Sequence, residues 1–416
     1  MSRSEPKDQT LEPPARALPR LSRPVAFWAM ASVLGLYLFC SSATTPLYVV
    51  YQADWHFPAS TLTAIFSVYA LALLLALTVA GSISDRAGRR RVILAAIVLQ
   101  TLAMVIFVLA HSVGALYLAR IVQGVATGIA TGAVSAAIID LQPPHNSRLG
   151  ALVAATAPGV GLVIGALGSG VVVQFAPYPL RLIYLIEILL LVLAGVAVAL
   201  SPETIARRPG WWRTFRVAVA VPRPARAVFW SLVPGMIATW ALGGLYLSLG
   251  PTLAAGLLHS HSHIVGALVP ATLSATSALS SVLTRGWFPR RAILLGDAAL
   301  ALGVGLTMLA TDRSSTTLFF SGAAVAGLGF GSAFAASFRA IAPLAPPNAR
   351  AALLAAIYIV CYLAFSIPSV LAGLSVIHQG LHRTSTIFGT TVILLALCAA
   401  GAYVRATARS VVTATD

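Results

Sequence analysis

Charged side chains are scarce in this chain. Only 9% of its 416 residues are Asp, Glu, Lys or Arg, and only 11 of these are acidic. Soluble globular domains carry about 25% charged residues, so a chain with 58% hydrophobic residues and a mean hydropathy of +0.90 falls outside that class. The composition predicts an integral membrane protein.

Cysteines and secretion signals are also few. Cys40, Cys361 and Cys398 lie inside apolar segments, so we interpret them as small buried side chains rather than as a disulfide framework. Residues 1–24 are polar, rich in Pro and Arg, and lack a short apolar core followed by a cleavage site. We expect them to form a disordered cytoplasmic tail, with the first hydrophobic helix retained.

Motifs that mark an enzyme or an ATP-driven machine are absent. The sequence has no phosphate-binding P-loop, zinc-protease histidine pair or nucleophile elbow. GLGFG at 327–331 lies in an apolar run with no strand before it, so we interpret it as small-residue helix packing. HSHSH at 259–263 is interpreted as a solvated loop, because a metal site needs fixed geometry and further ligands. We therefore predict no enzymatic activity, no bound metal and no cofactor.

Long hydrophobic runs dominate the chain. A membrane-spanning helix needs about 20 apolar residues, and only helices satisfy the backbone in lipid when alternating strand patterns are missing. The sequence therefore predicts an all-α integral membrane fold. Twelve spans are expected: 25–51, 59–82, 91–110, 114–140, 149–174, 179–200, 227–250, 264–284, 292–311, 316–341, 350–375 and 385–404.

Basic residues gather in alternate breaks between these runs. The net charge of +16 and pI near 10.8 come almost entirely from arginines in short loops, which favours membrane topology over nucleic-acid binding. With both termini cytoplasmic, the outer loops hold only Arg181, Arg313 and Arg383. We expect a multi-pass protein of the inner (cytoplasmic) membrane, with its basic loops against the anionic inner leaflet.

The longest charged break, 201–226, divides the chain into two halves of six spans, 25–200 and 227–404, followed by a tail at 405–416. Its six arginines, with Trp211 and Trp212, leave two interpretations open, a solvated linker and a short amphipathic helix on the membrane surface. SISDRAGRRRVIL at 82–94 aligns with VLTRGWFPRRAIL at 282–294, so the halves read as a diverged repeat. Such duplications place a binding site between the halves.

Residues 81–93, GSISDRAGRRRVI, resemble the loop between helices 2 and 3 of the major facilitator superfamily of transporters. The resemblance implies two six-helix bundles that rock about a central cavity, with this loop latching them while the cavity faces outward. The matching residues are Gly81, Asp85, Arg86, Gly88, Arg89 and Arg90. We add Asp140, which ends the fourth span on the same edge. The alternative is a loop whose arginines follow the positive-inside rule and have no gating role.

Two further stretches resemble the drug:proton antiporter branch of that family. LYLARIVQGVATG at 116–128 matches its helix 4 motif in Arg120, Gln123 and Gly124. TAPGVGLVIG at 156–165 partly matches the helix 5 motif, keeping Pro158 and Gly161 at the helix kink but lacking two of the usual glycines. Small residues also recur at every fourth position in both spans, which predicts close helix contact. The resemblance implies proton-coupled export.

Three charged residues lie deep in spans and are candidates for proton coupling: Arg120, Glu187 and Asp297. Arg120 and Glu187 fall at one depth, so we hypothesise that they pair or share a proton-dependent network, with Glu187 neutral when unpaired. The alternatives are a static ion pair and a Glu187 that is simply a partner of Tyr184 and Arg181. For Asp297, the nearby Arg285, Arg290 and Arg291 offer a purely structural pairing.

The expected cargo is a small amphipathic drug or metabolite, because so few charges are available to bind multiply charged anions. Candidate cavity residues are Tyr37, Gln123, Trp240, Tyr246, Tyr358 and Tyr362. No cofactor is expected beyond the proton gradient, and the protein is expected to function as a monomer. A metabolite or sugar importer or uncoupled facilitator, and a transport-inactive membrane receptor, remain the alternatives.

Overall fold

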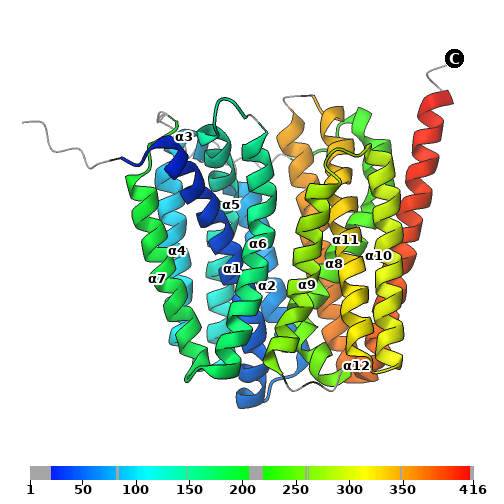
Figure 1. The fold of residues 1–416 in the computed structure, drawn as a ribbon, viewed down its shortest axis with the longest axis horizontal. Helices are drawn as coiled ribbons and strands as arrows, with labels where there is room; N and C mark the ends of the chain where they lie inside the picture. Colours follow the sequence, from blue (N-terminus) through cyan, green and yellow to red (C-terminus); the bar gives the residue numbers. More distant parts are fainter. Residues whose placement is uncertain are drawn as a thin grey trace, which may run out of the picture.

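Eleven long helices in two groups make up the computed structural model of the protein (Figure 1). It describes residues 20–80, 84–146, 148–205, 219–257, 260, 262–346 and 349–412. Within these ranges every regular element is helical, and the all-α membrane fold predicted from the sequence is confirmed.

The helices follow the predicted spans closely. The first group contains α1 (Arg23–Trp55), α2 (Ala59–Ala80), α4 (Arg89–Val108), α5 (Val113–Leu141), α6 (Leu149–Phe175) and α7 (Pro179–Leu200). The second contains α8 (Arg226–Leu257), α9 (His263–Leu283), α10 (Pro289–Asp312), α11 (Thr316–Ile341) and α12 (Arg350–Val412). The short elements are α3 (Ser84–Ala87), η2 (Arg223–Ala225) and η3 (Ala342–Leu344).

Helix α12 contains two of the twelve predicted spans. Its 63 residues would extend about 95 Å as one straight helix, roughly three times a bilayer core. The helical geometry breaks at Gly380, whose φ of 78° and ψ of 167° belong to a region that glycine adopts readily. Ser375 and Thr384 join the two limbs through a hydroxyl hydrogen bond of 2.9 Å. Figure 1 shows the chain descending in orange and returning in red.

The start of α1 and the end of α12 lie at the same end of the molecule, together with α3 (Figure 1). We call this end the terminal face and the other end the far face. Six crossings in each group and two chain ends on one face agree with the even number of spans predicted from the sequence. Of the three cysteines, Cys40 and Cys361 are buried as expected. Cys398 is exposed on α12, and the expectation of burial was wrong there because lipid accepts apolar side chains on the outside.

Small residues bring helices together inside the first bundle. A Cβ on Gly124 would overlap the Tyr69 carbonyl of α2, and a Cβ on Gly161 would overlap the Gly35 carbonyl of α1. The close contact predicted from the small-residue ridges of 114–140 and 149–174 is confirmed at both positions. GLGFG at 327–331 is likewise packed against neighbouring helices, with Gly331 against the Ser277 carbonyl of α9.

The two bundles meet along α2 with α12 and α6 with α9, and to a smaller extent along α1 with α8. Thr45 donates a hydrogen bond to the Leu247 carbonyl at 3.0 Å, and Ser67 donates to the Ser366 carbonyl at 3.1 Å. The rings of Phe66 and Phe365 also pack across this boundary, with centroids 5.1 Å apart. These contacts join the two bundles directly along this boundary.

Candidate functional site

A charged cluster on the terminal face ties together the ends of several helices in the first bundle. Arg89 forms an ion pair with Asp140 at 2.6 Å, and the Thr204 hydroxyl donates to the same carboxylate at 3.0 Å. Arg23 donates to the Asp140 main-chain carbonyl at 2.8 Å. Asp140 therefore fastens α4, α1 and the segment after α7 to the end of α5.

The neighbouring loop is only partly described. Gly88 has a φ of 93°, which suits glycine at this reversal between α3 and α4. Arg86 is exposed, and Arg90 donates to the Ser201 carbonyl at 3.3 Å. Gly81 and the side chain of Asp85 lie outside the described part, so the predicted latch at Asp85 stays a prediction. The proposed helix containing Trp211 and Trp212 lies outside it too.

Arg120 of α5 is fully buried, and polar groups of α1 surround it. Its Nε donates to the Tyr48 hydroxyl, and its terminal nitrogens donate to the Thr44 hydroxyl and to the Ser41 carbonyl at 3.3 Å. Gln123 accepts a further bond from it at 2.7 Å. Among the residues that the structure describes, the guanidinium is thus held without an acidic partner.

Aromatic rings complete the enclosure of this guanidinium. The Arg120 Cζ lies 5.1 to 5.9 Å from four ring centroids, a distance at which cations are attracted to aromatic faces. The rings belong to Tyr48, Phe66, Tyr69 and Phe107. Sequence reasoning identified Arg120 and Gln123 but missed this aromatic cage, because its members come from three helices with no shared spacing.

Glu187 of α7 is also fully buried, and neither of its carboxyl oxygens has a hydrogen-bond partner in the described residues. The expected ion pair with Arg120 is absent there, and so is the alternative bond to Tyr184, whose hydroxyl is unpartnered. Arg120 acts on Glu187 electrostatically without touching it. Equal depth in the membrane does not determine which neighbouring helix a side chain faces. Helix α7, which contains Glu187, packs on α4, α1 and α6 rather than on α5, which contains Arg120.

Two more polar side chains near Glu187 lack partners. Gln100 of α4 and Tyr37 of α1 are both fully buried, and their amide and hydroxyl atoms have no hydrogen bond in the described part of the chain. Tyr37, predicted to line the cavity, therefore lies inside the first bundle. Buried groups of this kind are uncommon and mark places where water or a proton is accommodated.

Asp297 of α10 is the buried acid of the second bundle, with 1% of its surface exposed. Both of its oxygens lack partners in the described residues. The predicted pairing with Arg285, Arg290 or Arg291 was wrong: all three are exposed near the terminal face, and Arg291 instead lies over the Trp287 ring at 4.9 Å. The residues that line its pocket are Leu232, Gly235, Met236 and Thr239 of α8 and Ala333, Phe334 and Ser337 of α11.

An aromatic cluster adjoins that pocket and reaches the boundary between the bundles. Trp240 of α8 lies 5.1 Å from Tyr362 and 5.4 Å from Phe334, measured between ring centroids. Tyr358 joins through Tyr362 at 6.3 Å. The remaining members of this aromatic cluster are Phe330, Phe338, Phe365 and, from the first bundle, Phe66.

Three of the six predicted cavity residues thus come together: Trp240, Tyr358 and Tyr362. Tyr246 does not join them, since it is buried and stacks on Phe319 with centroids 6.1 Å apart. The phenylalanines of α11 were missed, although their spacing of four residues at 330, 334 and 338 would have revealed one aromatic helix face.

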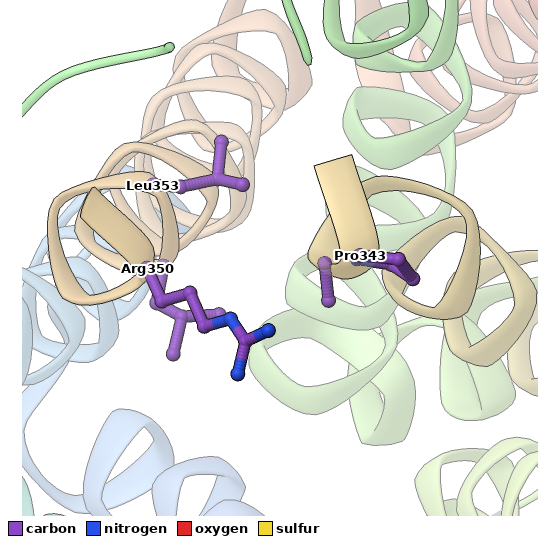
Figure 2. A pocket seen from close by; sticks show the side chains of 5 residues that line it. Pro343, Arg350 and Leu353 are labelled. Atoms are coloured by element: carbon purple, nitrogen blue, oxygen red, sulfur yellow. The ribbon is translucent and has the colours of Figure 1, made fainter. Parts of the chain in front are cut away.

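A separate pocket of about 340 Å³ opens at the terminal face between α11, η3 and the start of α12 (Figure 2). Arg350 lies along its edge and donates to the Ala345 carbonyl at 3.4 Å. The other lining residues are Ala342, Pro343, Leu353 and Leu354. It is a largely apolar recess with a single cation.

Comparison with known proteins gives one consistent family. The model of the Major Facilitator Superfamily matches residues 30–369. An uncharacterized MFS-type transporter of Bacillus subtilis, YceJ, is 23% identical over 381 residues, which cover 89% of this chain and 93% of that protein. The quinolone resistance protein NorA of Staphylococcus aureus is 25% identical over 101 residues, covering 24% of this chain and 26% of NorA.

Solved structures show the same fold. A bacterial homologue of the human lysosomal transporter Spinster, in an inward-facing and unoccupied conformation, superposes with a TM-score of 0.72 at 14% identity. The match covers 92% of this chain and 98% of that one. The same homologue in an inward-facing, occupied conformation gives a TM-score of 0.71.

Proposed function

The chain belongs to the major facilitator superfamily of membrane transporters, and from that premise we propose that it exports small amphipathic molecules in exchange for protons. Transport proceeds by alternating access, with the two bundles rocking about the cargo. The terminal face is the cytoplasmic side of the inner membrane, as the distribution of arginines favours.

The aromatic cluster at the bundle boundary carries this proposal. Its rings offer large apolar faces and two tyrosine hydroxyls, and among them lies the Trp240 indole N–H, which has no hydrogen-bond partner in the described residues. Aromatic faces bind flat or weakly cationic molecules, whereas multiply charged anions need clustered basic groups. Small amphipathic drugs or metabolites fit this surface best.

The two buried acids support proton coupling. Glu187 and Asp297 lie in separate bundles, each without a hydrogen-bond partner in the described residues. An unpaired charge in such a place is costly, so each acid fits the interior as the neutral, proton-bearing form. Taking up and losing that proton gives the gradient a means to drive the cycle. The relation to NorA, whose name records quinolone resistance, favours export.

The charged cluster around Asp140 is assigned to control of the cycle. With Gly81, Asp85, Arg86, Gly88, Arg89 and Arg90, it forms the latch that holds the cytoplasmic ends together when the cavity faces outward. The Arg89 to Asp140 ion pair keeps the loop bound to the end of α5. Pro158 and Gly161 let α6 bend beside α1 during rocking.

A flux assay in proteoliposomes tests the function. A fluorescent lipophilic cation such as ethidium is loaded, a pH gradient is imposed in either direction, and its movement is followed. We expect movement against the proton gradient, reversed when the gradient is reversed and abolished by a protonophore. Flux that only follows the ethidium gradient at every pH would indicate an uncoupled facilitator, and binding without flux would indicate a receptor.

A further inference from the structure

One phenylalanine lies beside two buried polar groups that lack hydrogen-bond partners in the described residues. Phe334 lines the pocket of Asp297, and its ring meets the Trp240 ring edge-on at 66° with centroids 5.4 Å apart. Neither the Asp297 oxygens nor the Trp240 Nε1 has a hydrogen-bond partner in the described residues. The Asp297 carboxyl, which can accept a hydrogen bond, and the Trp240 N–H, which can donate one, therefore both lie beside Phe334.

The backbone of α8 puts the indole within reach of that acid. Met236 lines the Asp297 pocket, and Trp240 follows it by four residues, on the same helix face and about 6 Å along the axis. Gly235 of the same helix lies directly against the carboxyl, since a Cβ there would lie 3.3 Å from Asp297 Oδ1. A rotation of the indole, with Phe334 displaced, brings donor and acceptor together.

None of the arginines described on the surrounding helices is hydrogen-bonded to Asp297. On α8, Arg226 donates to the Val221 carbonyl, and on α11, Arg339 donates to the Thr284 carbonyl. Other titratable groups on the surrounding elements include Arg290, Arg291 and Asp312 of α10, Tyr246 of α8, and Tyr358, Cys361, Tyr362, Cys398, Tyr403 and Arg405 of α12. Since a lone carboxylate is costly here, this arrangement fits the neutral acid.

We infer that Asp297 is a proton-binding site linked to the aromatic cluster through Phe334 and Trp240. With the proton bound, Phe334 separates the two groups and the indole packs against Tyr362 and Phe365, as in this structure. When the proton leaves to water, Phe334 moves aside and the indole N–H donates to the carboxylate. That hydrogen bond stabilises the charge in place of the lost proton.

This movement of the indole, which we call the switch, links proton release to cargo binding. In this respect the inference rests on the proposed exchange of cargo for protons. An indole turned toward Asp297 vacates its place beside Tyr362 and Phe365, where an amphipathic cargo then fits. Protonation releases the indole, which returns to the cluster and expels the cargo. Proton and cargo therefore exclude one another although they occupy different sites.

Tryptophan emission of the purified full-length protein, titrated with pH in the absence of cargo, tests the switch. The difference between wild type and Trp240→Phe isolates the indole at this position. We expect that difference to show a single pH transition, which Asp297→Asn abolishes. Phe334→Leu removes the barrier and should move the midpoint by about 1 pH unit, a tenfold change in proton affinity. Phe320→Leu, on the same helix but packed on Phe319 outside the aromatic cluster, is the matched control and leaves the midpoint in place.

A transition that survives Asp297→Asn, or a wild-type difference with no transition, overturns the switch. Phe334→Met and the melting temperature of each variant separate a misfolded protein from a changed switch. The flux assay is independent: coupled ethidium flux without a Trp240 transition refutes this inference alone, whereas the transition without coupled flux refutes the proposed function alone.

Discussion

Arg120 of the first bundle and Asp297 of the second are buried in opposite ways. In the first bundle Arg120 is enclosed by hydroxyls, a carbonyl, an amide and four aromatic rings. In the second, Asp297 has no partner in the described residues and adjoins the aromatic cluster. A satisfied charge holds its surroundings in one arrangement, whereas an unsatisfied one can exist in two protonation states with two sets of neighbours. The difference suggests a rigid region around Arg120 and a switching region around Asp297.

The largest effect should come from removing the satisfied charge. Arg120→Ala strands the acceptors of Gln123, Tyr48 and Thr44 and empties the aromatic cage, which we expect to cost about 3–5 kcal/mol of folding free energy. Unfolding in mixed micelles measures it. Arg120→Lys should recover part of the loss because it restores the charge but fewer hydrogen bonds. An Arg120→Ala protein as stable as wild type would show that the contacts of Arg120 do not stabilise the first bundle, and the contrast with Asp297 would be lost.

Removing the titratable group of Asp297 should have the opposite effect, with little change in stability and a large loss of flux. Asp297→Asn loses no hydrogen bond, so its stability should stay within about 1 kcal/mol of wild type while gradient-driven flux falls at least about tenfold. Melting temperature and ethidium flux are measured on the same preparation.

Glu187→Gln is the corresponding variant in the first bundle, where Glu187 lacks a hydrogen-bond partner in the described residues. We expect it also to weaken the pH dependence of flux, by its loss of a titratable group. An unchanged pH dependence in Glu187→Gln would remove Glu187 from coupling and leave Asp297 as the acid that carries the proton.

A smaller effect is expected for cargo affinity. Tyr362→Ala removes one large ring from the aromatic cluster and should weaken ethidium binding by about tenfold, corresponding to about 1.4 kcal/mol. Tyr246→Phe, stacked on Phe319 outside the cluster, is the control and should bind as wild type does. Equal losses in both variants would place the cargo outside the aromatic cluster.

The smallest effect should come from the terminal face. Asp140→Asn weakens the ion pair with Arg89, so we expect a few-fold slower flux with ethidium binding unchanged. Arg285→Ala, at the corresponding place in the second half, should change neither, since Arg285 is exposed. Loss of binding in Asp140→Asn would show that Asp140 shapes the cargo site rather than the cycle.

The sequence was sufficient for the fold because span length and loop charge are local properties. It placed the helices within a few residues and located Asp140 on the same edge as Arg89. The sequence did not predict the contacts that depend on the direction in which a side chain projects from its helix. Glu187 lies at the depth of Arg120 but does not contact it. Asp297 does not contact the arginines nearest to it in the chain. Tyr37 and Tyr246 failed as cavity residues for the same reason, since an aromatic residue in a span fits lipid, core or cavity equally well.

The break at Gly380 matters for how the protein is made. Only one non-helical residue separates the last two crossings, and Ser375 and Thr384 already bind each other across the bend. The polar residues between them, His378, Gln379, His382 and Arg383, are themselves helical, so no extended loop lets each crossing enter the bilayer on its own. The final limb must then be inserted together with the one before it, as a helical hairpin. A chain halted before residue 381 would leave half of that hairpin in the membrane without its partner, so a late truncation should be cleared by membrane quality control rather than tolerated as a trimmed tail.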